Sequence, residues 1–209
     1  MRFTDAQIDE LRERVRASMS DFRFTHTAEV EKMAARIGEI YAPDKMDILR
    51  VAALLHDITK EIGVDEQIAI LERNGEQMGL FARLAHKTLH ARTAVYAIMQ
   101  VYPEFADEEV IRAVRYHTTG HPNMTLTEMI VYLADYIDES RKFEDCIKLR
   151  NYFWDARPEE MNESEREEHL LRTLLLSFDM TLTSLINEGS LTSVESVGAR
   201  NSIIAKLKF

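Results

Sequence analysis

The pair His56–Asp57 stands at the end of a segment that is apolar on nearly every side, VAALLHDITK. Two adjacent ionisable side chains at the end of a buried helix are costly unless a partner or a bound ion compensates them. The pair is also compatible with a histidine that the helix dipole favours and an aspartate that caps the following turn. On its own, the pair therefore leaves a metal site and a simple helix end equally open.

Three other histidines lie near the ends of expected helices: His26 and His90 near helix starts, and His117 before the sequence TTG. Asp135 lies within the apolar segment IVYLADYI, where a carboxylate without a partner is unfavourable. Imidazole and carboxylate groups together suit two divalent metal ions, with one carboxylate able to bridge them. Such a centre lowers the pKa of a bridging water toward neutrality, and the resulting hydroxide can attack phosphorus. The pattern therefore indicates metal-dependent phosphoryl chemistry.

Two cations follow these candidate ligands in the sequence. Lys60 comes one helical turn after His56 and can stabilise the negative charge on a departing phosphate oxygen, although a solvated surface lysine has the same spacing. Arg141 follows Asp135 by six residues and can either grip phosphate oxygens or cap the preceding helix. We therefore expect Asp57 and Lys60 to act in catalysis, and Lys60 and Arg141 to bind substrate.

The sequence HTTGHP after the candidate ligand His117 supplies further candidates for substrate binding. Thr118 and Gly120 can offer hydroxyl and backbone contacts to phosphate, and His121 can donate a hydrogen bond to phosphate or bind no ligand. His86 lies four residues before His90, so the two can share one helix face. We interpret His86 as a surface or supporting residue, and its part in the site stays open, as does that of His121.

The elements that would position these residues are predicted to be helical. The chain has 209 residues with only 7 Gly and 4 Pro, and no segment alternates with the period of a strand. We therefore expect an all-α protein without a β-sheet. The hydrophobic pattern predicts helices at about residues 5–19, 25–41, 46–59, 65–73, 76–85, 88–101, 107–117, 125–140, 143–156, 164–188 and 193–207.

Composition excludes several classes of protein. Cys146 is the only cysteine, so no disulfide forms within the chain and a metal site must use histidine and carboxylate. The net charge is −10 and no run of Lys or Arg is present, which excludes a nucleic-acid partner. The longest apolar runs, such as Val51–Leu55, are too short for a membrane span, and the chain opens with a polar amphipathic segment. We expect a cytoplasmic protein that does not engage membranes, with a homodimer left open.

The order of these residues resembles the HD-domain superfamily of metal-dependent phosphohydrolases. The segments FTHTAEV, ALLHDITK, LHARTAV, IRAVRYHTTGHPNMT and IVYLADYIDESRKF are similar to the bacterial YqeK family, over about residues 20–150. The dipeptide HD alone is a weak signal. The ordered combination of HDxxK, HTTG and ADYIxxxR is much more specific.

The resemblance implies a fold, an activity and a ligand set. It implies a single helical HD-domain bundle that hydrolyses the acid anhydride of diadenosine tetraphosphate symmetrically to two ADP. It also implies a two-iron centre, and manganese, cobalt or zinc would suit the same donors. The implied ligands are His26, His56, Asp57 and Asp135 for one metal and Asp57, His90 and His117 for the other, with Asp57 bridging. The predicted organisation is an N-terminal helix (1–20), an HD-domain core (21–150) and a C-terminal helical extension packed on the core (151–209).

The chain departs from that family in three places. Ile58 follows HD where an aromatic residue is common, DESRKF stands where Glu-Pro precedes the arginine, and the part after about Arg150 has no match. Substrate choice therefore stays open between dinucleoside polyphosphates and other substrates of HD phosphohydrolases, such as deoxynucleoside phosphates, cyclic nucleotides or another phosphoester. A third alternative is a nucleotide-binding module without catalytic activity, which the complete ligand set disfavours.

Overall fold

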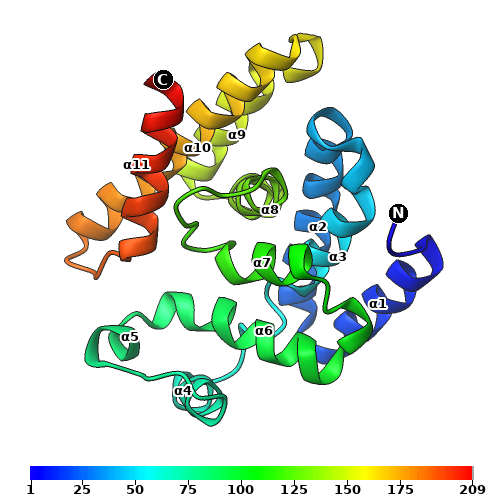
Figure 1. The fold of residues 1–209 in the computed structure, drawn as a ribbon, viewed down its shortest axis with the longest axis vertical. Helices are drawn as coiled ribbons and strands as arrows, with labels where there is room; N and C mark the ends of the chain where they lie inside the picture. The colour runs from blue at the N-terminus through cyan, green and yellow to red at the C-terminus, as the bar shows by residue number, and fades with distance from the viewer. Residues whose placement is uncertain (209) are drawn as a thin grey trace.

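The regular structure of the chain is entirely helical (Figure 1). The computed structural model describes residues 1–208, and no strand occurs in this range, which confirms the predicted all-α class. The α-helices are α1 (Asp5–Ser18), α2 (Asp21–Tyr41), α3 (Met46–Leu55), α4 (Val64–Arg73), α5 (Leu80–Leu84), α6 (Leu89–Val101), α7 (Glu108–Tyr116), α8 (Leu126–Ile137), α9 (Glu144–Asp155), α10 (Glu163–Asn187) and α11 (Val194–Lys208). Short 3₁₀ turns cover Pro43–Lys45, His86–Thr88, Pro103–Phe105 and Pro158–Glu160.

Helix α3 lies at the centre of the helices that carry the candidate ligands. All its residues except Met46 and Arg50 are buried. It packs against α1, α2, α7 and α8, which explains why its sequence is apolar on nearly every side. Figure 1 shows α8 end-on in the middle of the molecule, with α2 and α3 on one side and α7 below it. The helices that carry the candidate ligands therefore surround one core.

The C-terminal helices share this core. Phe153 of α9, Phe178 of α10 and Ile203 of α11 belong to the same apolar cluster as the side chains of α2, α3 and α8. Helix α10 packs against α8, α9 and α11, and α9 also packs against α8. The side chains of residues 151–208 thus help to bury α8, which carries Asp135.

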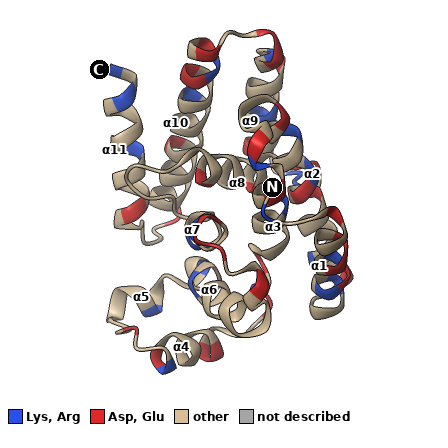
Figure 2. Cartoon of the chain, turned by 45° about the vertical axis from the view of Figure 1, so that its right-hand side comes forward, with Lys and Arg blue, Asp and Glu red and all other residues tan. Residues whose placement is uncertain are grey.

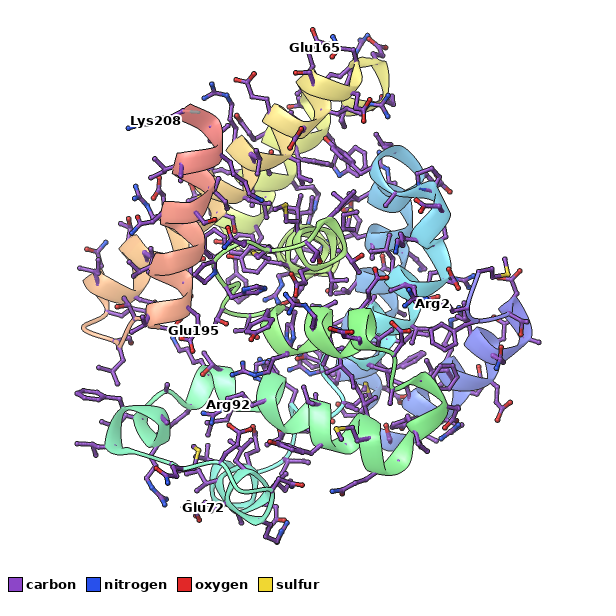
Figure 3. All side chains as sticks on the ribbon, viewed as in Figure 1. Arg2, Glu72, Arg92, Glu165, Glu195 and Lys208 are labelled. Carbon is purple, nitrogen blue, oxygen red and sulfur yellow. The ribbon has the colours of Figure 1, made fainter. Side chains whose placement is uncertain are left out.

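The N-terminal segment is fastened to α3 and α7. The backbone N–H of Phe3 donates to Asp47 of α3 at 2.9 Å, and Arg2, labelled in Figure 3, pairs with Asp107 at 2.6 Å before α7. The ring of Phe3 lies 5.3 Å from that of Phe105. These contacts hold the N-terminal segment against α3 and the start of α7.

Three predicted helix boundaries were wrong. Helix α2 begins at Asp21, because the Ser20 hydroxyl accepts a hydrogen bond from the N–H of Arg23, so His26 lies inside the helix rather than at its start. Helix α3 ends at Leu55 and not near residue 59, since consecutive turns follow it. The predicted helix at 76–85 is only α5.

Basic and acidic residues are interspersed along the helices in the view of Figure 2. None of the helices in residues 1–208 combines the length and the apolar character that a membrane span requires.

Candidate metal centre

Side chains from five segments converge where helices end. His26 comes from α2, His56 and Asp57 follow α3, His90 comes from α6, His117 ends α7, and Asp135 comes from α8. Five of these six residues are buried, and Asp135 is partly buried. Their side chains form overlapping groups of three in which all potential ligand atoms lie within 4.8 Å: His26, His56 and Asp57; His56, His117 and Asp135; and Asp57, His90 and His117.

Asp57 divides its two carboxylate oxygens between two pairs of histidines. Oδ2 lies 3.8 Å from Nε2 of His26 and 3.6 Å from Nε2 of His56. Oδ1 lies 3.3 Å from Nε2 of His90 and 3.7 Å from Nε2 of His117. A carboxylate with one oxygen facing each pair has the arrangement required to bridge two cations.

Hydrogen bonds behind the centre orient two of the imidazole rings. Nδ1 of His56 lies 2.6 Å from the carbonyl oxygen of Ala53, and Nδ1 of His117 lies 2.7 Å from that of Val114. A proton on Nδ1 that donates to a carbonyl leaves the lone pair on Nε2, which faces the centre. Nε2 of His56 is buried and has no hydrogen-bond partner within residues 1–208. This arrangement is typical of a metal ligand.

His26 is held from behind in the same way. Its Nδ1 lies 3.2 Å from the Ser140 hydroxyl and 3.4 Å from Oδ2 of Asp138, which is fully buried. Its Nε2 lies 3.0 Å from Oδ1 of Asp135 but, like that of His56, makes no hydrogen bond within the described chain. Nε2 of His26 therefore faces the centre and can bind a cation once it has lost its proton.

Most of the candidate ligands have the protonation state that a metal requires. Burial lowers the pKa of His56 to about 4 and holds the pKa of His90 well below its usual value, so both rings are neutral at pH 7. Burial raises the pKa of Asp57, but the neighbouring histidines and Lys60 outweigh it and bring the pKa well below 3.8. The centre thus offers two neutral imidazoles, those of His56 and His90, and the charged carboxylate of Asp57.

His26 and Asp135 form a coupled pair at the edge of the centre. Burial lowers the pKa of His26, but the neighbouring carboxylates of Asp135 and Asp138 stabilise the protonated ring, outweigh burial and raise the pKa to about 9. Burial raises the pKa of Asp135, and the charge of Arg141 outweighs it, so that the pKa lies well below its ordinary value. A cation that binds Nε2 of His26 must displace its proton. The donor set as a whole fits two divalent cations.

Lys60 and Thr118 lie beside the centre, as the sequence predicts. Nζ of Lys60 is 3.0 Å from Nε2 of His90 and 4.0 Å from Oδ1 of Asp57, and burial lowers its pKa. The Thr118 hydroxyl is 3.2 Å from Nε2 of His90 and 3.0 Å from Nε2 of His117. Both side chains can therefore reach a group bound between these histidines.

The guanidinium of Arg141 binds Asp135, which is a candidate metal ligand. Its Nε donates to the backbone oxygen of Asp135 at 2.6 Å, and its Nη2 donates to Oδ1 of the same residue at 2.5 Å. The guanidinium thus both closes the end of α8 and fixes the Asp135 carboxylate. This contact explains the charge state of Asp135 and leaves phosphate binding by Arg141 as a prediction.

The remaining candidates lie outside the ligand groups. Gly120 has φ +60°, and an added Cβ would lie 2.6 Å from the Phe178 ring, so this position needs glycine. The turn directs His121 to Glu128, with Nε2 3.1 Å from Oε2, and stacks its ring on Tyr116 at 4.1 Å. His86 is exposed in the 3₁₀ turn before α6. The structure therefore does not bring His86 or His121 to the centre.

Two residues of the centre were missed by the sequence reasoning. Arg23 donates from Nη1 to Oδ2 of Asp57 at 2.7 Å, and Asp138 lies behind His26. For Arg23 the spacing was an available signal, because it precedes His26 by three residues and so lies on the same face of α2. Asp138 lies just beyond the end of α8, so helical spacing gave no such signal for it.

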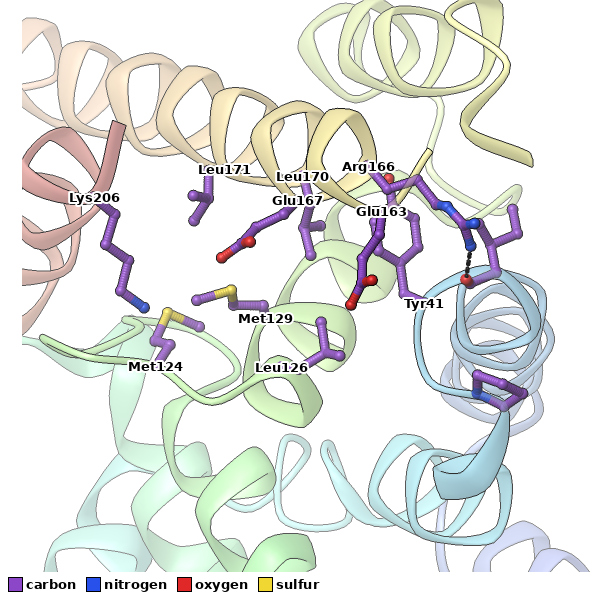
Figure 4. A pocket seen from close by; sticks show the side chains of 12 residues that line it. Tyr41, Met124, Leu126, Met129, Glu163, Arg166, Glu167, Leu170, Leu171 and Lys206 are labelled. Carbon is purple, nitrogen blue, oxygen red and sulfur yellow. Dashed lines mark hydrogen bonds between the residues drawn. The ribbon is translucent and has the colours of Figure 1, made fainter. Parts of the chain in front are cut away.

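A cavity of about 440 Å³ opens beside the centre. We call it the His26 cavity, and its lining residues are Phe22, Arg23, His26, Ser140, Arg141, Lys142 and Phe143. A separate cavity of about 500 Å³ lies between the end of α2 and helices α8, α10 and α11 (Figure 4). Its walls include Tyr41, Leu126 and Glu163 but no candidate metal ligand, so we place the chemistry at the His26 cavity.

The helical fold and the buried histidine–aspartate centre are those of an HD-domain hydrolase, and the cluster of ligand types is consistent with a metal site. The HD-domain family model matches residues 23–140, and the chain belongs to this family of phosphohydrolases. A symmetrical bis(5'-nucleosyl)-tetraphosphatase from Halalkalibacterium halodurans is 34% identical over 137 residues, which cover 65% of this chain and 71% of that protein. A protein of the same name from Bacillus subtilis is 32% identical over 138 residues, 65% of this chain and 72% of that protein.

A solved structure extends the similarity beyond the HD domain. The crystal structure of a predicted HD superfamily hydrolase involved in NAD metabolism, from Clostridium acetobutylicum, has a TM-score of 0.80 and 29% identity. It covers 95% of this chain and 97% of that one. The helices after residue 150, which matched nothing at the level of sequence motifs, therefore have counterparts in that protein.

Proposed function

We propose that this protein hydrolyses diadenosine tetraphosphate and related dinucleoside polyphosphates symmetrically, to two nucleoside diphosphates. The division of the Asp57 oxygens between two histidine pairs carries the proposal, because it supports a centre for two cations. The names of the bacterial relatives at 34% and 32% identity support the substrate class. Polyphosphate anhydrides carry several negative charges, which two cations can neutralise.

The residues around the centre have separate roles in this proposal. His26, His56, Asp57 and Asp135 would hold one cation, and Asp57, His90 and His117 would hold the other. When bound, the cations would polarise phosphoryl oxygens and activate water for attack on phosphorus. Lys60 supplies a positive charge 3.0 Å from His90, where it can stabilise the departing diphosphate.

Iron is the metal that we favour, and the donor set also suits manganese, cobalt and zinc. All candidate ligands are imidazole nitrogens or carboxylate oxygens, which are common ligands of these ions. The thiol of Cys146 is absent from the candidate ligand groups of the described chain. Iron is favoured on the resemblance to the YqeK family alone.

The products of diadenosine tetraphosphate test the proposed function directly. With Fe²⁺ or Mn²⁺ added, we expect ADP as the sole nucleotide product in anion-exchange chromatography, since attack occurs at one of the two central phosphates. ATP plus AMP in equal amounts would contradict symmetrical cleavage. Turnover of a deoxynucleoside triphosphate or a cyclic nucleotide in place of diadenosine tetraphosphate would support another HD phosphohydrolase activity.

A further inference from the structure

The His26 cavity joins the metal centre to the surface through a candidate ligand. His26 lines the cavity and also contributes Nε2 to the centre. Two of the cavity's cations contact other candidate ligands: Arg23 donates to Asp57 and Arg141 to Asp135. A molecule that reacts at the centre can therefore extend into this cavity.

Two phenylalanines that line this cavity are largely exposed to solvent and are not packed in the core. Phe22 is 81% exposed and Phe143 is 70% exposed. Phe22 lies one helical turn before His26 on α2, and Phe143 is the residue before α9. Large aromatic side chains at the mouth of a pocket are suited to stack on a flat ring.

The remaining charged residues of the cavity favour an anion. Arg23, Arg141 and Lys142 line it, and no carboxylate does, although the whole chain has a net charge of −10. Nζ of Lys142 donates to the backbone oxygen of Glu139 at 2.7 Å and forms no ion pair within residues 1–208. Arg23 and Arg141 are already paired with Asp57 and Asp135, so Lys142 is the lining cation that remains available to an anion beside the two aromatic rings.

We propose that the His26 cavity binds one nucleoside diphosphate half of the substrate, with its base stacked on Phe22 and Phe143 and its phosphates beside Lys142 and Arg141. This inference rests on the proposed function, because it takes a nucleotide as the ligand. Stacking on a phenyl ring does not distinguish between bases, since every base presents a π-face. The inferred substrate class is therefore dinucleoside polyphosphates in general, and not those of adenine alone.

The binding of ADP and of inorganic pyrophosphate to the Mn²⁺-loaded protein separates the aromatic and the phosphate contributions. Isothermal titration calorimetry with Phe22→Ala and Phe143→Ala should show ADP affinity weakened by about tenfold or more in each variant, because stacking on the base is lost. Pyrophosphate affinity should stay within about twofold of wild type, since it has no base. Phe81→Ala removes a phenylalanine of α5 that is 74% exposed and lies outside the cavity, and it should leave both affinities unchanged.

Three outcomes would overturn the inference. One is ADP affinity that stays within about twofold of wild type in both variants. The second is an equal loss of ADP and pyrophosphate affinity, which would show general damage to the centre. The third is a change of oligomeric state in sedimentation velocity with ADP binding unaltered, which would make the phenylalanines an interface. Failure of the proposed function is distinguishable, because wild-type protein would then bind ADP through this cavity without cleaving diadenosine tetraphosphate.

Discussion

Asp57→Asn is expected to remove most of both metal ions and to lower phosphohydrolase activity by at least about a thousandfold. Each oxygen of this carboxylate faces a different pair of histidines, at 3.6 and 3.8 Å on one side and 3.3 and 3.7 Å on the other. The amide has nearly the same size but lacks the negative charge that both cations require. Inductively coupled plasma mass spectrometry gives the metal content, and circular dichroism checks that the helices are retained.

A matched substitution controls for the loss of one carboxylate. Asp44 is exposed in the 3₁₀ turn before α3 and lies outside the candidate ligand groups. Asp44→Asn should keep the full metal content and activity. Two metal ions per chain in Asp57→Asn would show that this residue does not bridge them.

Lys60→Ala is expected to lower kcat by about two to three orders of magnitude while KM changes far less. Its ammonium lies 3.0 Å from Nε2 of His90, and in the proposed mechanism the leaving phosphate oxygen gains charge beside it in the transition state. A cation that contacts this oxygen stabilises the transition state more than the bound substrate, and its loss costs about 2–4 kcal/mol. Steady-state kinetics on the metal-loaded variant, with metal content measured in parallel, separates this effect from metal loss.

Lys87→Ala provides the comparison for Lys60. Lys87 is exposed and pairs with Glu188 at 3.1 Å, away from the candidate ligands. Its removal should leave kcat unchanged. If Lys60→Ala stayed within about threefold of wild-type kcat, the ammonium would not act on the leaving group, and the cations alone would supply the stabilisation.

The sequence was sufficient to predict the central helix and the ligand types. A segment that is apolar on nearly every side predicts a helix that is surrounded by other helices. The ionisable pair after this segment predicts a partner or a bound ion that compensates its charge. Asp135 was a candidate because its carboxylate breaks a local rule inside an apolar helix, whereas the choice of His26, His90 and His117 depended on the resemblance to the HD-domain superfamily. The all-α class followed from the helical periodicity and the few glycines and prolines.

The parts that could not be predicted depend on local geometry or tertiary contacts. Thr25 and Thr27 are also suited to cap a helix, and the choice of one of them instead of Ser20 misplaced His26 at the start of α2. The direction of His121 depends on the left-handed turn at Gly120, which points it toward Glu128. The spacing of Arg141 and Asp135 in the sequence does not determine whether their side chains contact each other, so it could not predict that Arg141 binds the Asp135 carboxylate.

Anomalous diffraction from crystals of the metal-loaded protein, collected at the iron or manganese absorption edge, tests the central claim most directly. We expect two peaks on either side of the Asp57 carboxylate, one beside His26, His56 and Asp135, and the other beside His90 and His117. A single peak bounded by only one histidine pair, or peaks that do not contact Asp57, would contradict a dinuclear centre in this protein.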